Sequence, residues 1–72
     1  MATAKKYYVY RISKITGRKE YKSRKTLDYW AGVSMKPYCW QFSRHGANGI
    51  VKWQTERHGW HYEFGAEEVT EA

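Results

Sequence analysis

The sequence predicts an α+β fold, a small antiparallel β-sheet of three to four strands with one α-helix packed on one face. Three observations predict it. Residues 7–15 are rich in aromatic and β-branched side chains, which favour a strand. Residues 47–54 place apolar side chains at helical spacing. Residues 60–64 alternate between aromatic and polar side chains, as a half-buried strand does.

The first strand is predicted to turn back into a second one and form a β-hairpin. Thr16-Gly17 follows the first strand, and glycine supplies the positive φ that a tight turn needs. Residues 18–23 then return as the second strand. Most of their side chains are charged, so at least one face of this strand should be exposed to solvent.

Residues 24–37 have a less regular pattern. Residues 25–30 are compatible with a third strand or with a short helical turn. We expect the whole stretch to be a loop that Leu27 and Trp30 attach to the core. The residues that interrupt any longer pattern are Gly32, Ser34 and Pro37.

A short strand and the helix follow. Residues 38–42 predict a strand with three aromatic side chains on one face, namely Tyr38, Trp40 and Phe42. Ser43 is a suitable helix N-cap, and Gly59 is a suitable stop. Gly46 and Gly49 should weaken the helix by about 1 kcal/mol each relative to alanine, and would permit close packing against a sheet. The stripe expected to face the sheet comprises Ala47, Ile50, Val51 and Gln54, with Trp53 beside it.

The last strand, residues 60–64, should point Trp60, Tyr62 and Phe64 toward one face. We expect one domain over residues 1–72, with a flexible basic N-terminus (1–6), a folded core (7–64) and a flexible acidic tail (65–72). The side chains expected to be largely buried are Trp40, Phe42, Ile50, Val51, Trp60 and Tyr62.

The amino-acid composition indicates the cellular compartment of the protein and the residue types that form its hydrophobic core. Aromatic residues make up 18% of the 72 residues, so rings should supply much of the core. Cys39 is the only cysteine, which excludes an intramolecular disulfide and favours the cytoplasm. No apolar run is long enough to span a membrane, and we expect no membrane partner.

Positive charge is concentrated in the first half of the chain. Residues 1–36 contain ten lysines and arginines against two acidic residues, whereas residues 37–72 contain three against five. A basic half on a small domain attracts acidic partners, which include nucleic acids and acidic protein surfaces.

The hairpin and its flanks are the candidate contact surface. Cations bind phosphates or carboxylates, and interleaved aromatic rings can stack on bases or act as apolar anchors. In the alternative interpretation, the tyrosines belong to the core and the lysines are merely solvated. The predicted partner-binding residues are Tyr8, Tyr10, Arg11, Lys14, Arg18, Lys19, Tyr21, Lys22, Arg24 and Lys25, with Tyr7 as a further possible anchor.

Few residue patterns in the sequence would support catalysis or metal binding. His58 and His61 have loose metal-ligand spacing, and Cys39 could add a thiolate, but the tight ligand pairs of a structural zinc site are incomplete. A thiol nucleophile at Cys39 lacks an oriented base. We therefore expect no enzymatic activity, no cofactor and no metal, and a monomer that acts by binding.

Two stretches carry a resemblance to known proteins. They are Tyr7-Tyr8-Val9-Tyr10-Arg11-Ile12, leading through Gly17 to Glu20-Tyr21, and Trp40-Gln41-Phe42-Ser43-Arg44-His45-Gly46-Ala47, leading to Ile50. Together they resemble small bacteriophage early proteins that bind host RNA polymerase and inhibit transcription initiation. The resemblance covers about two thirds of the chain and implies a regulator in the host cytoplasm. It assigns no functional residue.

Three functions therefore compete. The first is a regulator that docks on an acidic surface of RNA polymerase, and we favour it on the resemblance. The second is a direct DNA- or RNA-binding protein that uses the basic aromatic hairpin. The third is a structural or assembly component of a phage particle.

Overall fold

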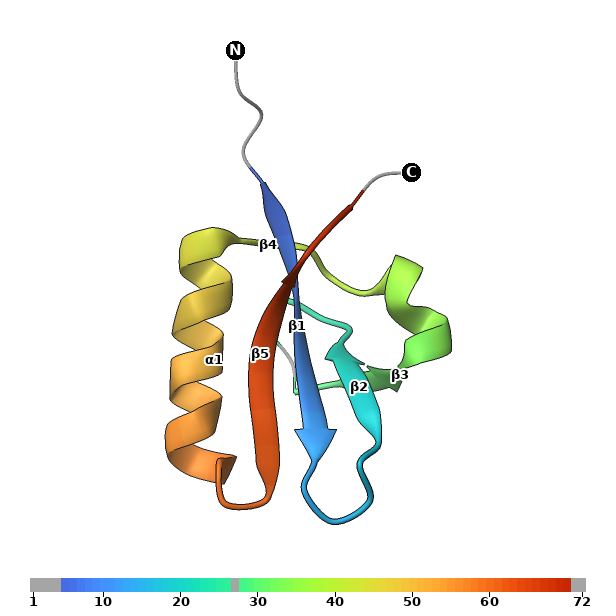
Figure 1. Ribbon diagram of the computed structural model, residues 1–72. Helices are drawn as coiled ribbons and strands as arrows, with labels where there is room; N and C mark the ends of the chain where they lie inside the picture. The colour runs from blue at the N-terminus through green and yellow to red at the C-terminus, as the bar shows by residue number, and fades with distance from the viewer. Residues whose placement is uncertain (1–4, 27, 71–72) are drawn as a thin grey trace.

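The computed structural model of the protein describes residues 5–26 and 28–70. A five-stranded antiparallel sheet carries one α-helix, which confirms the predicted α+β class and adds a strand (Figure 1). In chain order the elements are β1 (Lys6–Ser13), β2 (Lys19–Lys22), β3 (Trp30–Gly32), the 3-10 helix η1 (Val33–Tyr38), β4 (Phe42–Ser43), α1 (Arg44–His58) and β5 (Tyr62–Glu68).

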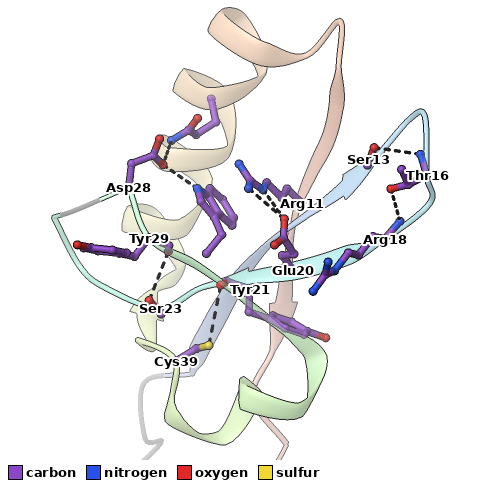
Figure 2. A network of polar contacts seen from close by, with 12 residues as sticks. Arg11, Ser13, Thr16, Arg18, Glu20, Tyr21, Ser23, Asp28, Tyr29 and Cys39 are labelled. Atoms are coloured by element: carbon purple, nitrogen blue, oxygen red, sulfur yellow. Dashed lines mark hydrogen bonds and ion pairs between the residues drawn. The ribbon is translucent and has the colours of Figure 1, made fainter.

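The predicted hairpin is confirmed. Strands β1 and β2 are antiparallel, with Tyr10 opposite Tyr21. Gly17 has a φ of 75°, a conformation that glycine adopts without steric cost, and its N–H donates to the Ser13 carbonyl at 2.8 Å. The Ser13 hydroxyl also accepts from the Thr16 N–H at 3.1 Å, so the turn is held by its own residues (Figure 2).

The acidic end of the chain belongs to the sheet. Strand β5 pairs with β1 along its whole length, from Ser13 opposite Tyr62 to Tyr7 opposite Glu68. Residues 65–68 therefore continue the strand predicted to end at residue 64, and the prediction of a flexible tail is wrong for them. The N–H of Val69 also bonds to the Lys6 carbonyl.

The stretch predicted to be a loop contains two elements. Strand β3 pairs with β2, and η1 follows it directly. Trp30 packs against the core as expected, whereas Leu27 lies outside the described residues. Pro37 does not end η1 but lies within it, and the Cys39 N–H closes the helix on the Lys36 carbonyl.

The strand predicted over residues 38–42 is wrong except at its end. Tyr38 is the last residue of η1, and β4 begins only at Phe42. Cys39 turns inward, with its thiol donating to the Met35 carbonyl at 3.3 Å. This inward turn leaves Tyr38 and Trp40 on the outside, 78% and 47% exposed.

Helix α1 has the predicted ends and buried stripe. The Ser43 hydroxyl accepts from the Gly46 N–H at 3.1 Å, and the Gly59 N–H donates to the Thr55 carbonyl at 2.9 Å. Ala47 and Gln54 are buried on the stripe, and the Gln54 amide donates to Asp28 at 3.4 Å. The expected close packing at Gly49 is wrong, because nothing lies within 4 Å of a Cβ built there.

Both faces of the sheet are covered, and each has its own core. Side chains alternate along β1, so Val9 faces α1 and Tyr8 faces the opposite side. Figure 1 shows α1 and η1 on opposite sides of β1. Buried hydrophobic side chains on the α1 side are Val9, Phe42 and Ala47, and those on the opposite side are Tyr8, Tyr21 and Cys39.

The predicted core is partly right. Phe42 is buried, and Ile50, Val51 and Tyr62 are half-buried. Trp60 is 77% exposed because it lies in the turn between α1 and β5 instead of in the strand. No helix in the described part of the chain is long and apolar enough to cross a membrane.

Candidate contact surface

Three predicted contact residues are buried. Tyr8 and Tyr21 form part of the core opposite α1, where their rings meet edge-to-face at 5.8 Å. Lys22 is buried on the α1 side, with its ammonium group 5.7 Å from the centre of the Trp30 ring, and desolvation lowers its pKa. The interpretation of the tyrosines as core residues is therefore right for Tyr8 and Tyr21, and these three side chains do not present an open surface.

Arg11 is engaged within the fold. Its guanidinium group bonds to the Glu20 carboxylate through Nε and through a terminal nitrogen, both at 3.0 Å (Figure 2). The same group lies 4.6 Å from the Trp30 ring centre and 4.3 Å from the Tyr62 ring centre. Two rings and one carboxylate thus hold Arg11 on the α1 side of the sheet.

Lys14 and Arg18 flank the hairpin turn and are exposed. The Lys14 ammonium donates to the Gly59 carbonyl at 2.6 Å, which ties the hairpin turn to the end of α1. The Arg18 N–H donates to the Thr16 hydroxyl at 3.2 Å (Figure 2). Both residues are thus exposed at one end of the sheet, with the Lys14 ammonium engaged by the Gly59 carbonyl.

Four side chains converge on the sheet face opposite α1, and we call them the Glu67 cluster: Lys19, Tyr21, Lys36 and Glu67. The Lys19 ammonium lies 3.1 Å from Glu67 Oε1, and the Tyr21 hydroxyl donates to the same oxygen at 3.1 Å. Lys36, from η1, pairs with Oε2. The cluster joins η1 and β2 to the end of β5.

The pKa shifts follow from these contacts. The hydrogen bond from Lys36 is the main reason that the pKa of Glu67 is lowered, and it outweighs desolvation. The same bond raises the pKa of Lys36. Desolvation alone would lower the pKa of Lys19, but its bonds to Glu67 and Tyr21 outweigh that effect and raise it.

Tyr10 is half-buried beside this cluster. Its ring lies over Gly65 on β5, and the Lys19 ammonium lies 4.4 Å from the ring centre. Tyr7 is half-buried on the α1 side. Neither ring is available as a fully exposed stacking surface.

Arg24 and Lys25 lie in a different setting. Both are exposed, and within residues 5–26 and 28–70 neither has an acidic partner. They line a shallow hollow of about 600 Å³ on the outside of β3 and η1. We call it the cation–aromatic hollow, and its lining residues are Ser23, Arg24, Lys25, Thr26, Ala31, Met35, Tyr38 and Trp40.

Three large apolar side chains that line this hollow are strongly exposed to solvent. Met35, Tyr38 and Trp40 are each close to half exposed or more. Large exposed apolar side chains that gather in one place mark interaction sites. The hollow therefore combines two cations with an aromatic and thioether wall.

The sequence pattern predicted Arg24 and Lys25 as contact residues, but it did not predict the exposed aromatic side chains of the hollow. It placed Tyr38 and Trp40 in a buried strand because their spacing is that of a strand. The nearby Pro37 was the available signal for an irregular, outward-facing segment. It also missed Lys36 and Glu67, which only the fold brings together.

Cys39, the candidate thiol, is buried. Burial raises the pKa of the Cys39 thiol, which disfavours the thiolate. Within the described ranges, no three histidine, cysteine, aspartate or glutamate side chains are grouped to hold a metal ion.

Comparisons with known proteins yield no relative. No protein-family model matches the chain, and neither a curated protein nor a solved structure matches it.

Proposed function

We propose that the protein is a non-enzymatic regulatory protein that binds an acidic surface of bacterial RNA polymerase and inhibits transcription. The observation that supports an acidic partner is the cation–aromatic hollow, which Arg24 and Lys25 line together with exposed aromatic side chains. Support for polymerase as that partner comes from the resemblance of the hairpin and of residues 40–50 to phage early proteins.

The chemistry of the hollow suits a protein interface. Aromatic residues, methionine and arginine are enriched in such interfaces, and tryptophan, tyrosine and arginine dominate their hot spots. Trp40 and Tyr38 would pack against an apolar side chain of the partner. Arg24 and Lys25 would pair with carboxylates around it and speed the encounter.

Direct binding of single-stranded nucleic acid is the second candidate. The observation in its favour is the same placement of cations next to exposed rings, because cations bind phosphates and rings stack on bases. The two candidates differ in salt dependence. Phosphate binding gives a linear fall of log affinity with log salt, whereas an anchored protein contact is less steep.

The test compares two charge reversals of equal size. Arg24→Glu/Lys25→Glu changes the hollow, and Arg44→Glu/Lys52→Glu changes two exposed cations of α1. Binding to purified bacterial RNA polymerase, to oligothymidylate and to duplex DNA is measured for both variants and for the wild type. We expect the hollow variant to lose polymerase binding at least tenfold and the α1 variant to change far less.

Three outcomes decide against parts of the proposal. If the two variants weaken polymerase binding equally, net charge and not the hollow explains it. If only the α1 variant loses binding, the contact lies on the helix. If the wild type binds oligothymidylate tightly and ignores polymerase, the nucleic-acid function replaces the first candidate.

A further inference from the structure

The Glu67 cluster differs from the other ion pairs in its charge balance. Two ammonium groups, from Lys19 and Lys36, share the single carboxylate of Glu67. In contrast, Arg11 and Glu20 form a neutral pair of one cation and one carboxylate. The cluster therefore keeps a net positive charge next to its acidic occupant.

The two lysines are also positioned by contacts that do not involve Glu67. The Lys19 ammonium lies 4.4 Å from the Tyr10 ring centre and 5.2 Å from that of Tyr21. The Lys36 ammonium lies 5.5 Å from the Tyr8 ring centre and 5.4 Å from that of Tyr21. Cations over ring faces are attracted by the ring quadrupole. These ring contacts favour the present positions of both ammonium groups independently of Glu67.

A partner can reach these groups. About a third of each side chain is exposed, 33% for Lys19, 38% for Lys36 and 29% for Glu67. Ion pairs at such exposed positions contribute little stability, so the carboxylate can be exchanged at small cost. The Tyr21 hydroxyl donates to both oxygens of Glu67 at 3.1 and 3.3 Å, but Tyr21 is only 3% exposed, so the two lysines are the donors open to a partner.

We propose that Lys19 and Lys36 form a carboxylate-binding site for an acidic side chain of the protein partner, and that Glu67 occupies this site in the isolated protein. The inference rests on the proposed function, because it takes the partner to be an acidic protein surface. Lys36 lies between Met35 and Tyr38, so η1 links this site to the cation–aromatic hollow. Glu67 acts as a competitor in the same chain and sets a threshold for weakly acidic partners.

The test replaces Glu67 by glutamine and uses a labelled poly-glutamate peptide as the probe. Glu67→Gln keeps the size of the side chain and removes its charge, which should strengthen binding about threefold to fivefold. Glu63→Gln is the control, since it removes the same charge from an exposed position of the same strand. Adding Lys36→Met to Glu67→Gln should abolish the gain.

A second measurement follows Glu67 in the wild-type protein. Saturation with poly-glutamate at neutral pH should shift the carbon NMR signal of the Glu67 carboxylate, because the probe takes its donors. Equal gains from Glu67→Gln and Glu63→Gln, or a gain that survives Lys36→Met, would overturn the site. A gain seen for oligothymidylate but not for poly-glutamate would overturn its carboxylate class.

These outcomes are separate from those of the proposed function. The carboxylate site can fail while the hollow variant still loses polymerase binding. Conversely, Glu67→Gln can strengthen poly-glutamate binding while polymerase is ignored, which would reject the polymerase and retain the site.

Discussion

At the scale of single residues, Trp60 and Phe42 show how surroundings decide the effect of one truncation. Phe42 is 6% exposed within the core under α1, and Phe42→Ala should cost about 3–5 kcal/mol through lost burial and a cavity. Trp60 is 77% exposed, so Trp60→Ala should cost less than about 1 kcal/mol. Urea denaturation followed by far-UV circular dichroism measures both. A Trp60→Ala protein that is unfolded in buffer would contradict the position of this ring.

The folding stability of the protein should depend on pH through Glu67, because the side chains that donate to its carboxylate lower its pKa. Its pKa lies below its ordinary value of 4.5, so the unfolded chain takes up the proton more readily than the folded one. The stabilisation is therefore present at neutral pH and is lost as pH falls below 4.5 through the folded pKa. The raised pKa values of Lys19 and Lys36 have the opposite sign, and their contribution is lost as pH rises above 10.5.

Glu67→Gln removes the carboxyl group whose lowered pKa makes the folded protein less stable in acid. Denaturation midpoints measured down through the acid range should fall less steeply for this variant than for the wild type. Glu63→Gln, on the same strand, should retain the wild-type slope. Parallel curves for the wild type and Glu67→Gln would show that the cluster does not couple protonation to folding.

At the scale of the elements, α1 contains a glycine that the packing does not require. Glycine costs about 1 kcal/mol relative to alanine inside a helix, and a Cβ at Gly49 meets nothing within 4 Å. Gly49→Ala should therefore stabilise the protein by up to about 1 kcal/mol. A Cβ at Gly46 would lie 3.1 Å from the Ser43 hydroxyl that caps the helix, so Gly46→Ala should gain less. Urea midpoints of the two variants test the difference, and equal gains would contradict it.

The elements that sequence predicted well are those encoded locally. The hairpin has its strand-forming side chains and Gly17 within one short segment, and α1 has its Ser43 cap and its apolar stripe. Strand β5 was predicted too short because Glu67 and Glu68 suggested a tail. Their partners, Tyr8 and Tyr7 on β1, lie far away in the chain. Local pattern carries no information on such pairing.

At the scale of the whole molecule, the fold neutralises part of the basic half. Lys5 pairs with Glu68, Arg11 pairs with Glu20, and Lys19 and Lys36 share Glu67, so four cations within residues 5–26 and 28–36 have acidic partners. The sequence shows the excess of positive charge, but it could not show which cations pair with acidic side chains inside the fold. It likewise could not show that Arg24 and Lys25 would line the same hollow as Trp40, which lies outward just after η1 and the inward turn of Cys39.

The separation between steering charges and anchoring rings makes a kinetic prediction for the proposed partner. Exposed cations mainly accelerate encounter, whereas a buried aromatic anchor mainly slows dissociation. Arg24→Glu/Lys25→Glu should therefore reduce the association rate and weaken its salt dependence. Trp40→Ala should leave the association rate nearly unchanged and raise the dissociation rate at least tenfold, the effect of a modest hot spot. Trp60→Ala, which removes an equally large ring outside the hollow, is the matched control and should change neither rate. Surface plasmon resonance against immobilised polymerase over a range of salt concentrations separates the two rates. If Trp60→Ala speeds dissociation as much as Trp40→Ala does, the anchor is not confined to the cation–aromatic hollow, and the turn between α1 and β5 belongs to the interface.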